Sequence, residues 1–320
     1  MIAVTESTVE CPVMGCSKKV ARQHKSFRRK PEFQCPEHRI YISPSTFEYE
    51  CETDNLLWAE PDDLALLRAI KSVKREVRMA RNNSEDALTW NVFRHLERSN
   101  QLPACLSAIS GSLVTDPEVI YWSYSQKVHG VCPELARARS MFGEHAQQSS
   151  EPDVIIISDQ AVFWIEAKLT ATNRTFPSNP NAQKEYLTGG GSWYQQVFRE
   201  DYQTVALCSR KYELMRFWLL GSWMAAQVGR AFYLVNVVLA EREQDIEAAF
   251  KPFLMENDCR RFIRVGWESL YGFLSHNDPL SKAQSALLGY FEDRTIGYKR
   301  LGELQRAFSL TADDLSWRAT

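Results

Sequence analysis

The sequence predicts an α/β protein, in which helices pack around a central β-sheet behind a small cysteine-containing module. Two observations support this fold class. Short runs rich in β-branched and aromatic residues, such as Val119–Ser125 and Ala231–Leu239, alternate along the chain with longer segments of helical periodicity. Cysteine and histidine residues form two close pairs within residues 11–38. Such pairs are typical of a small module that a metal ion stabilises.

The bulk composition is that of an ordinary globular protein. The 320 residues are 44% hydrophobic and 24% charged, enough for one large or two modest domains. A formal net charge of −2 gives no global sign of a polyanionic partner, so any nucleic-acid surface must come from local clusters. Met1–Glu10 lacks a secretory-signal pattern, and the apolar stretches are too short to cross a bilayer. We therefore expect a cytoplasmic protein without membrane contact, whose cysteines are thiols or metal ligands.

Shifts in charge and periodicity divide the chain into four regions. They are expected to be an N-terminal module at 1–60, a basic linker helix at 61–81, the core at 82–276 and a helical segment at 277–320. Apolar residues recur at helical spacing from Leu66 to Val77, so Pro61–Arg81 is predicted as one amphipathic helix. Its basic side is either a solvated face or a surface that contacts phosphates.

The core is expected to alternate strands and helices. A helix capped by Asn83 or Ser84 runs to about Arg98. Strands are predicted at Val119–Ser125, Asp153–Ser158, Ala161–Leu169, Ala231–Leu239 and Arg261–Val265. Later helices are predicted at Ser192–Ser209, Lys211–Gln227 and Ala240–Asn257, with further helical segments to the end. The stretch Thr170–Gly191 contains prolines and a run of glycines and is expected to be a long loop.

The most informative stretch runs from Glu151 to Lys168. Its two apolar runs predict strands that are buried on both faces. If Asp159-Gln160 is a two-residue hairpin loop, counting back along both strands places Asp153 directly opposite Glu166. A three-residue loop would make the two carboxylates diagonal neighbours instead. Because side chains alternate along a strand, Glu166 and Lys168 share a face in either case.

Two carboxylates that face each other at the end of a buried hairpin repel, and folding alone gives no reason for them. A divalent cation with hard oxygen ligands, such as Mg²⁺, removes this repulsion. The ammonium group of Lys168 adds a positive charge that can position water and stabilise a phosphate. The alternative interpretation is that these residues are surface charges at the ends of two core strands.

The hairpin resembles the PD-(D/E)xK, or restriction-endonuclease-like, nuclease superfamily. Pro152-Asp153, followed by twelve residues and then Glu166-Ala167-Lys168, matches its defining pattern. The resemblance covers about residues 82–274, and only the hairpin is specific. It implies a mixed sheet flanked by helices and a Mg²⁺-dependent endonuclease, with Mn²⁺ as a substitute metal. In such an enzyme Asp153, Glu166 and the Ala167 carbonyl hold the metal, and Lys168 positions the attacking water.

The resemblance also suggests two supporting positions. The family places a further acid on a helix before the hairpin, and Glu85 fits because it lies on the apolar stripe of its helix. A helix N-terminal acid that favours the dipole explains Glu85 equally well. Many members carry a glutamine on the helix after the hairpin. Gln195 is expected there, aimed into apolar surroundings, with Gln196 as the competing choice and a surface glutamine as the alternative.

The N-terminal module carries a second candidate metal site. Cys11 and Cys16 form one pair, Cys35 and His38 form the other, and eighteen residues separate the two pairs. Thiolates and imidazole in this order suit a tetrahedral structural zinc and resemble a zinc ribbon or treble-clef finger, with Cys51 as an alternative fourth ligand. Seven Lys and Arg residues lie between the pairs, from Lys18 to Lys30. They form either a nucleic-acid contact or a solvated loop.

Together these features predict a Mg²⁺-dependent endonuclease with a structural zinc and a nucleic-acid partner, DNA rather than RNA. By analogy with the family, restriction or phage defence is the expected setting. A homodimer or a partner protein remains open. Two alternatives belong to other classes: a zinc-containing nucleic-acid-binding protein whose nuclease fold no longer cuts, and a module that docks a partner enzyme.

Overall fold

The computed structural model describes residues 8–74, 78–144, 151–276, 279–299 and 302–310. Its centre is a mixed seven-stranded sheet in the order β11-β10-β9-β8-β5-β6-β7. The strands are β5 (Glu118–Tyr121), β6 (Tyr124–Ser125), β7 (Gly130–Val131), β8 (Val154–Ile157), β9 (Ala161–Ala167), β10 (Ala231–Val238) and β11 (Arg260–Gly266). Strands β9, β10 and β11 are parallel, and the remaining pairs are antiparallel. The predicted α/β class with a mixed central sheet is confirmed.

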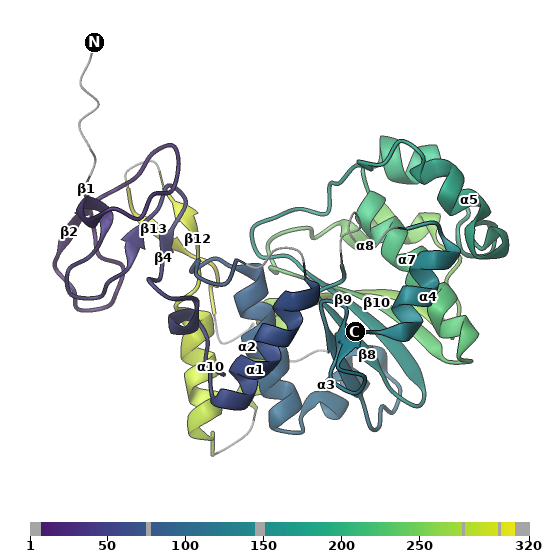
Figure 1. Ribbon diagram of the computed structural model, residues 1–320, viewed down its shortest axis with the longest axis horizontal. Coiled ribbons are helices and arrows are strands. Elements are labelled where there is room, and N and C mark those ends of the chain that lie inside the picture. Colours follow the sequence, from purple (N-terminus) through teal and green to yellow (C-terminus); the bar gives the residue numbers. More distant parts are fainter. Residues whose placement is uncertain (1–7, 75–77, 145–150, 277–278, 300–301, 311–320) are drawn as a thin grey trace, which may run out of the picture.

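Helices cover both faces of this sheet, which gives the core three layers (Figure 1). One face packs against α1 (Pro61–Val73), α2 (Glu85–Arg98), α3 (Leu102–Ser110), α9 (Trp267–Ser275) and α10 (Lys282–Glu292). The other packs against α4 (Pro133–Met141), α5 (Ala182–Ser192), α6 (Tyr194–Val197), α7 (Tyr212–Gln227) and α8 (Ile246–Phe250). Both faces of β8 and β9 are therefore buried, as their continuous apolar runs predicted.

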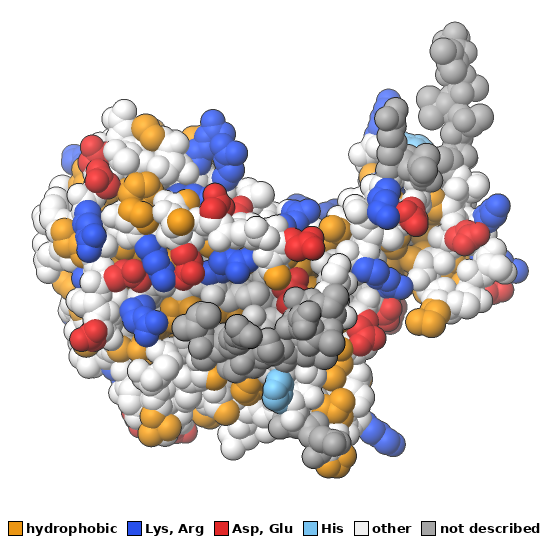
Figure 2. All heavy atoms as spheres, turned by 180° about the vertical axis from the view of Figure 1, so that it is seen from behind, with side chains coloured by type: hydrophobic (Ala, Val, Ile, Leu, Met, Phe, Trp, Pro, Cys, Tyr) orange, Lys and Arg blue, Asp and Glu red, His pale blue; other side chains and the backbone are white. Residues whose placement is uncertain are grey.

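The N-terminal module is a separate lobe that the end of the chain completes (Figures 1 and 2). It contains β1 (Thr8–Glu10), β2 (Lys19–Ala21), β3 (Tyr41–Ile42) and β4 (Phe47–Glu48), with the 3₁₀ turns η1 (Pro31–Phe33) and η2 (Glu52–Asn55). The hairpin of β12 (Thr295–Tyr298) and β13 (Leu304–Arg306) packs against it. The guanidinium of Arg22 lies 4.1 Å from the centroid of the Tyr298 ring. The helical prediction for 277–320 is therefore wrong for β12 and β13, and residues 311–320 lie outside the described residues.

Several predicted elements are confirmed at close to their expected bounds. Ser84 caps α2, because its hydroxyl oxygen accepts a hydrogen bond from the backbone N–H of Ala87 at 3.0 Å. Helix α2 ends at Arg98, as expected. Helix α7 and strands β10 and β11 also fall within a residue or two of their predictions. Within the described ranges, we find no helix with the length and apolar character needed to cross a membrane.

Two predicted elements are shorter than expected because tertiary contacts interrupt them. The helix predicted over Pro61–Arg81 ends at Val73, where Lys74 turns to extended backbone and pairs with Asp86. Arg75, on its predicted basic side, lies outside the described residues. The strand predicted over Val119–Ser125 is instead two strands, β5 and β6, joined by a tight turn at Trp122-Ser123. The prediction of one continuous strand is wrong at this point.

The segments before and after α7 contain more breaks than the sequence predicted. Ser192–Ser209 is not one helix: α6 ends at Val197, and a π-helical turn, η3 (Gln203–Cys208), follows it. Ala240–Asn257 contains only α8 and the 3₁₀ turn η4 (Lys251–Phe253), whose Pro252 has no backbone N–H to continue a helix. The predicted loop Thr170–Gly191 contains the helix α5 in its second half. Apolar periodicity alone did not reveal these breaks.

Candidate functional site

The β8–β9 hairpin has the short loop on which the site prediction depended. The backbone N–H of Ser158 donates to the Ala161 carbonyl at 2.9 Å, which closes the two-residue loop. Val154 pairs with Ile165 in antiparallel register, so the next pair along the ladder is Asp153 and Glu166. The two carboxylates are thus direct neighbours, and the alternative of a three-residue loop is wrong.

Glu166 faces the helical layer that contains α7, and Asp153 lies close to it. Their strand neighbours Ile155 and Trp164 belong to the hydrophobic cluster on that side, whereas Val154 and Ile165 belong to the opposite cluster. Alternation along β9 places Glu166 on the α7 side, and the same alternation extended one residue beyond β8 indicates that side for Asp153. The charge of Asp153 contributes to the raised pKa of Glu166, so the two carboxylates lie close together.

Hydrogen bonds fix the Asp153 carboxylate at both oxygens. Oδ1 accepts a hydrogen bond from the Trp122 indole Nε1 at 3.1 Å, and Oδ2 accepts one from the Ala167 backbone N–H at 2.8 Å. Loss of solvation raises the pKa of Asp153 to about 6, although the nearby Lys74 and Lys168 oppose this shift. The carboxylate is therefore held in one orientation and binds a proton more readily than a solvated aspartate.

Glu166 is nearly inaccessible and has a spare ligand atom. Its side chain is only 4% exposed, and its Oε1 forms an ion pair with Lys168. Its Oε2 is buried with no hydrogen-bond partner. Burial raises the pKa of Glu166 well above its usual value, and the charges of Glu213 and Asp153 add to this rise. A buried carboxylate oxygen without a partner is costly unless a cation or a proton occupies it.

Lys168 bridges two glutamates, one of which the sequence did not reveal. Its Nζ contacts Glu166 Oε1 and lies 2.9 Å from Oε2 of Glu213, in the first turn of α7. Burial disfavours the ammonium form, but Glu166 and Glu213 outweigh it and raise the pKa of Lys168. The same ion pair lowers the pKa of Glu213 against the effect of burial. The one sequence signal for Glu213 is its position in the first turn of a largely apolar helix.

The contacts of Glu85 and Gln195, the two supporting residues, differ from those expected. Glu85 Oε1 accepts hydrogen bonds from the backbone N–H groups of Leu169, Thr170 and Ala171, at 2.7–2.9 Å. It therefore fixes the segment that follows Lys168. Gln195 is exposed on the short helix α6, as is Gln196, so the expectation that it points into apolar surroundings is wrong. A catalytic role for either residue remains a prediction.

Asp153 and Glu166 are the two side chains of this site that could hold a metal ion. Mg²⁺ is usually held by one or two carboxylates, with waters and substrate phosphates completing its octahedron. Asp153 and Glu166 supply two carboxylates, and the partnerless Glu166 Oε2 is an available ligand atom. Among the described residues, the one group of three or more acidic, Cys or His side chains placed to share an ion lies in the N-terminal lobe. The Ala167 carbonyl remains a predicted ligand.

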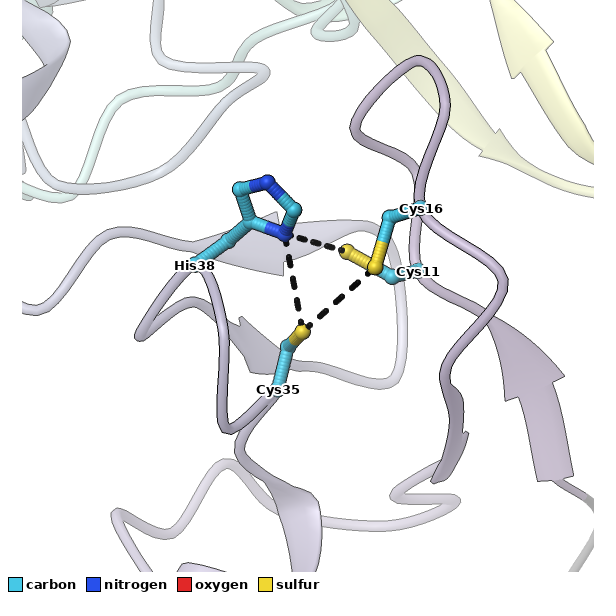
Figure 3. Close-up of side chains that lie close together, drawn as sticks. All are labelled: Cys11, Cys16, Cys35 and His38. Carbon is cyan, nitrogen blue, oxygen red and sulfur yellow. Dashed lines mark hydrogen bonds between the residues drawn. The ribbon is translucent and has the colours of Figure 1, made fainter.

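That group consists of the four predicted zinc ligands, Cys11, Cys16, Cys35 and His38. Their side chains point toward one another (Figure 3), and all ligand atoms lie within 4.8 Å of each other. Nδ1 of His38 is 3.7 Å from Sγ of both Cys11 and Cys35, and Sγ of Cys16 is 4.0 Å from that of Cys35. Ligands around a tetrahedral zinc are separated by about 3.5–3.8 Å. The geometry is compatible with structural zinc, and Cys51 is exposed and outside the group.

The basic segment between the two ligand pairs is partly neutralised. Lys18 pairs with Glu37 at 3.3 Å, and Lys30 pairs with Glu32 at 3.5 Å. Arg29 donates to the Glu50 carbonyl at 2.8 Å, and Arg22 donates to the Pro44 carbonyl at the same distance. Lys and Arg side chains nevertheless remain visible on both lobes in Figure 2, interspersed with acids. Of these four, only the two lysines are paired with acids, because the two arginines keep their charges when they donate to carbonyl oxygens.

Comparisons with protein-family models, with curated proteins and with solved structures gave no match for this chain. The function must therefore be argued from the geometry of the site itself.

Proposed function

We propose that the chain is a Mg²⁺-dependent nuclease that hydrolyses phosphodiester bonds, in DNA rather than RNA. One observation carries the proposal: the register of the β8–β9 hairpin, continued by one residue, brings Asp153 opposite Glu166, which Lys168 contacts. In this proposal the three-layer core is restriction-endonuclease-like, and its hairpin holds the metal at the end of two buried strands. A role in restriction or phage defence is an analogy with that family only.

Each residue has a distinct role in the proposed mechanism. Asp153 and Glu166 would hold Mg²⁺, which when bound neutralises phosphate charge and makes water more acidic. Because its pKa is raised, Lys168 stays protonated and acts as a hydrogen-bond donor rather than a base. Two of the three ammonium protons can serve Glu166 and Glu213, which leaves one for a water or a phosphate oxygen. Glu213 holds the lysine in place.

The N-terminal lobe would carry a structural zinc. We propose that Cys11, Cys16, Cys35 and His38 bind Zn²⁺ and that the ion stabilises a lobe with a small hydrophobic core. Contact between this lobe and the substrate is part of the same proposal, with Lys19, Lys25 and Arg28 as exposed basic side chains.

A cleavage assay tests the proposal. Purified protein is incubated with plasmid DNA and Mg²⁺ or Mn²⁺, beside Lys168→Ala and the matched variant Lys251→Ala. Lys251 also forms a salt bridge, with Glu247 at 2.8 Å, but this pair is exposed and lies far in sequence from Lys168. We expect Lys168→Ala to lose at least about 100-fold in rate, as for removal of a transition-state-stabilising group, and Lys251→Ala to cleave normally.

Three results would contradict the proposal in different ways. Absence of wild-type cleavage with every divalent metal would favour one of the non-enzymatic alternatives. Salt-sensitive DNA binding without cleavage would indicate a nucleic-acid-binding protein. Equal cleavage by wild type and Lys168→Ala would place the chemistry elsewhere in the molecule.

A further inference from the structure

Trp122 donates two hydrogen bonds to Asp153. Its indole Nε1–H donates to Asp153 Oδ1 at 3.1 Å, and its backbone N–H donates to the Asp153 carbonyl at 3.1 Å. The indole is 1% exposed, so water does not replace this donor. Carboxylates that bind metals are commonly oriented by hydrogen bonds of this kind, which also tune the affinity of the site.

The turn that carries Trp122 has an unusual backbone. Trp122 and Ser123 form the two-residue connection between β5 and β6, and both have positive φ, 44° and 76°. Hairpin turns with two such residues normally contain Asn, Asp or Gly, because other side chains are strained there. Neither residue is a glycine, and both are buried. Such strain persists only where surrounding contacts over-determine it, and the contacts of Trp122 with Asp153 are of this kind.

Lys74 and Asp86 hold the indole ring of Trp122 in place. Nζ of Lys74 lies 4.1 Å from the ring centroid, where a cation is attracted to the aromatic face. Asp86, in the first turn of α2, accepts a hydrogen bond from the same Nζ at 2.5 Å. The neighbouring Glu85 holds the backbone after Lys168. The first turn of α2 thus supports both ends of the candidate site, Asp153 through Trp122 and Lys168 through its following segment.

From these contacts we propose that Trp122 is a positioning residue, which fixes the Asp153 carboxylate in its metal-binding orientation while Lys74 and Asp86 hold the indole. This inference rests on the proposed function, because it requires that Asp153 binds a metal ion. It adds a residue that touches neither metal nor substrate, and it assigns a role to the strained turn between β5 and β6.

The test compares Trp122→Phe with the matched variant Trp58→Phe. Trp58 is also buried, its Nε1 donates to the Asn91 carbonyl at 3.0 Å, and Arg98 lies 4.8 Å from its ring centroid. Each substitution removes one indole N–H and keeps an aromatic ring. Mn²⁺ binding to the zinc-loaded full chain is measured by calorimetry, with Asp153→Asn to identify the site. Cleavage kinetics against Mg²⁺ and thermal unfolding without Mn²⁺ are measured in parallel.

We expect Trp122→Phe to bind Mn²⁺ about 10- to 100-fold more weakly, the usual effect of losing an outer hydrogen bond to a metal ligand. Excess Mg²⁺ should restore most of its kcat, and its KM for DNA should not change. Trp58→Phe should bind Mn²⁺ as the wild type does, even if both variants unfold at a lower temperature. A benzothiophene analogue at position 122, which keeps the ring shape without the N–H, gives the same result if Trp122→Phe does not fold.

The outcomes separate the inference from the proposed function. Asp153-dependent Mn²⁺ binding in the wild type that is unchanged in Trp122→Phe overturns the positioning role alone. An equal loss of affinity in Trp122→Phe and Trp58→Phe also overturns it, because the effect is then one of general stability. Absence of Asp153-dependent binding in the wild type overturns the proposed function, and the inference with it.

Discussion

Replacing Glu213 by glutamine tests whether this residue shares the charge of Lys168 with the metal ligand Glu166. The change keeps an oxygen that can accept from Lys168 Nζ, now 2.9 Å from Glu213 Oε2, but it removes the negative charge. A hydrogen bond to a charged partner contributes about 1.5–3 kcal/mol and a neutral one about 1 kcal/mol. Because both side chains are largely buried, at 13% and 16% exposure, we expect little screening by solvent and a loss of about 0.5–2 kcal/mol in stability.

The same change should weaken metal binding. With Glu213 neutral, the ammonium of Lys168 is held mainly by Glu166 and competes with a cation for that carboxylate. A competition energy of about 1.4 kcal/mol corresponds to a tenfold change in affinity. We therefore expect Glu213→Gln to need about tenfold more Mg²⁺ for half-maximal cleavage. Urea unfolding measures the stability, and a Mg²⁺ titration of the cleavage rate measures the affinity.

Glu247→Gln is the matched control for this prediction. Glu247 pairs with Lys251 at 2.8 Å, but both side chains are 38–40% exposed, so its loss should cost under about 0.5 kcal/mol. The ion pair lowers the pKa of Glu213, so its stabilisation is present above the unfolded value and is lost as the pH falls below it. The stability difference between wild type and Glu213→Gln should therefore shrink in acid. If Glu213→Gln loses no more stability than Glu247→Gln and keeps its Mg²⁺ dependence, the bridging role of Glu213 is refuted.

Three further predictions concern the ions and the loop beside them. Burial raises the pKa of Asp153 to about 6 and also raises the pKa of Glu166, so Mg²⁺ affinity should rise with pH up to pH 6 and continue to rise above it. The metal-free fold should lose stability as pH rises from 4 to 6, and calorimetry at several pH values checks both. Purified protein should contain one zinc per chain by elemental analysis, and Cys35→Ser should lower that content while leaving the core helices detectable by circular dichroism. Glu85→Gln, which weakens three backbone hydrogen bonds to one carboxylate oxygen, should cost about 2 kcal/mol in urea unfolding, and an unchanged midpoint would contradict its role as a loop support.

The hairpin could be predicted from the sequence because its geometry is local. A two-residue loop fixes the register, and the register alone pairs Asp153 with Glu166. The N-terminal ligands could be predicted for a similar reason, since spacing within a short module limits which side chains can meet. His38, rather than Cys51, completes the group because Cys35 and His38 lie on one short turn.

The partners of these residues could not be predicted, because each comes from a distant part of the chain. Glu213 reaches Lys168 across 45 residues, and Trp122 reaches Asp153 across 31 residues. The end of α1 has the same cause: apolar periodicity continues past Val73, but the contact of Lys74 with Asp86 stops the helix. The β12–β13 hairpin packs against the other end of the chain, so the sequence of residues 277–320 alone gave no sign of its partner.

The charge balance of the site supports the proposal of a cation-binding centre from a separate direction. Asp153, Glu166 and Glu213 lie near one another with Lys168 between the two glutamates, so buried negative charge exceeds the positive charge that contacts it. A folded protein can relieve this excess only by taking up protons or a cation. The raised pKa values of Asp153 and Glu166 are the response through protons. In our proposal, a divalent ion displaces those protons and also binds the Glu166 oxygen that has no hydrogen-bond partner.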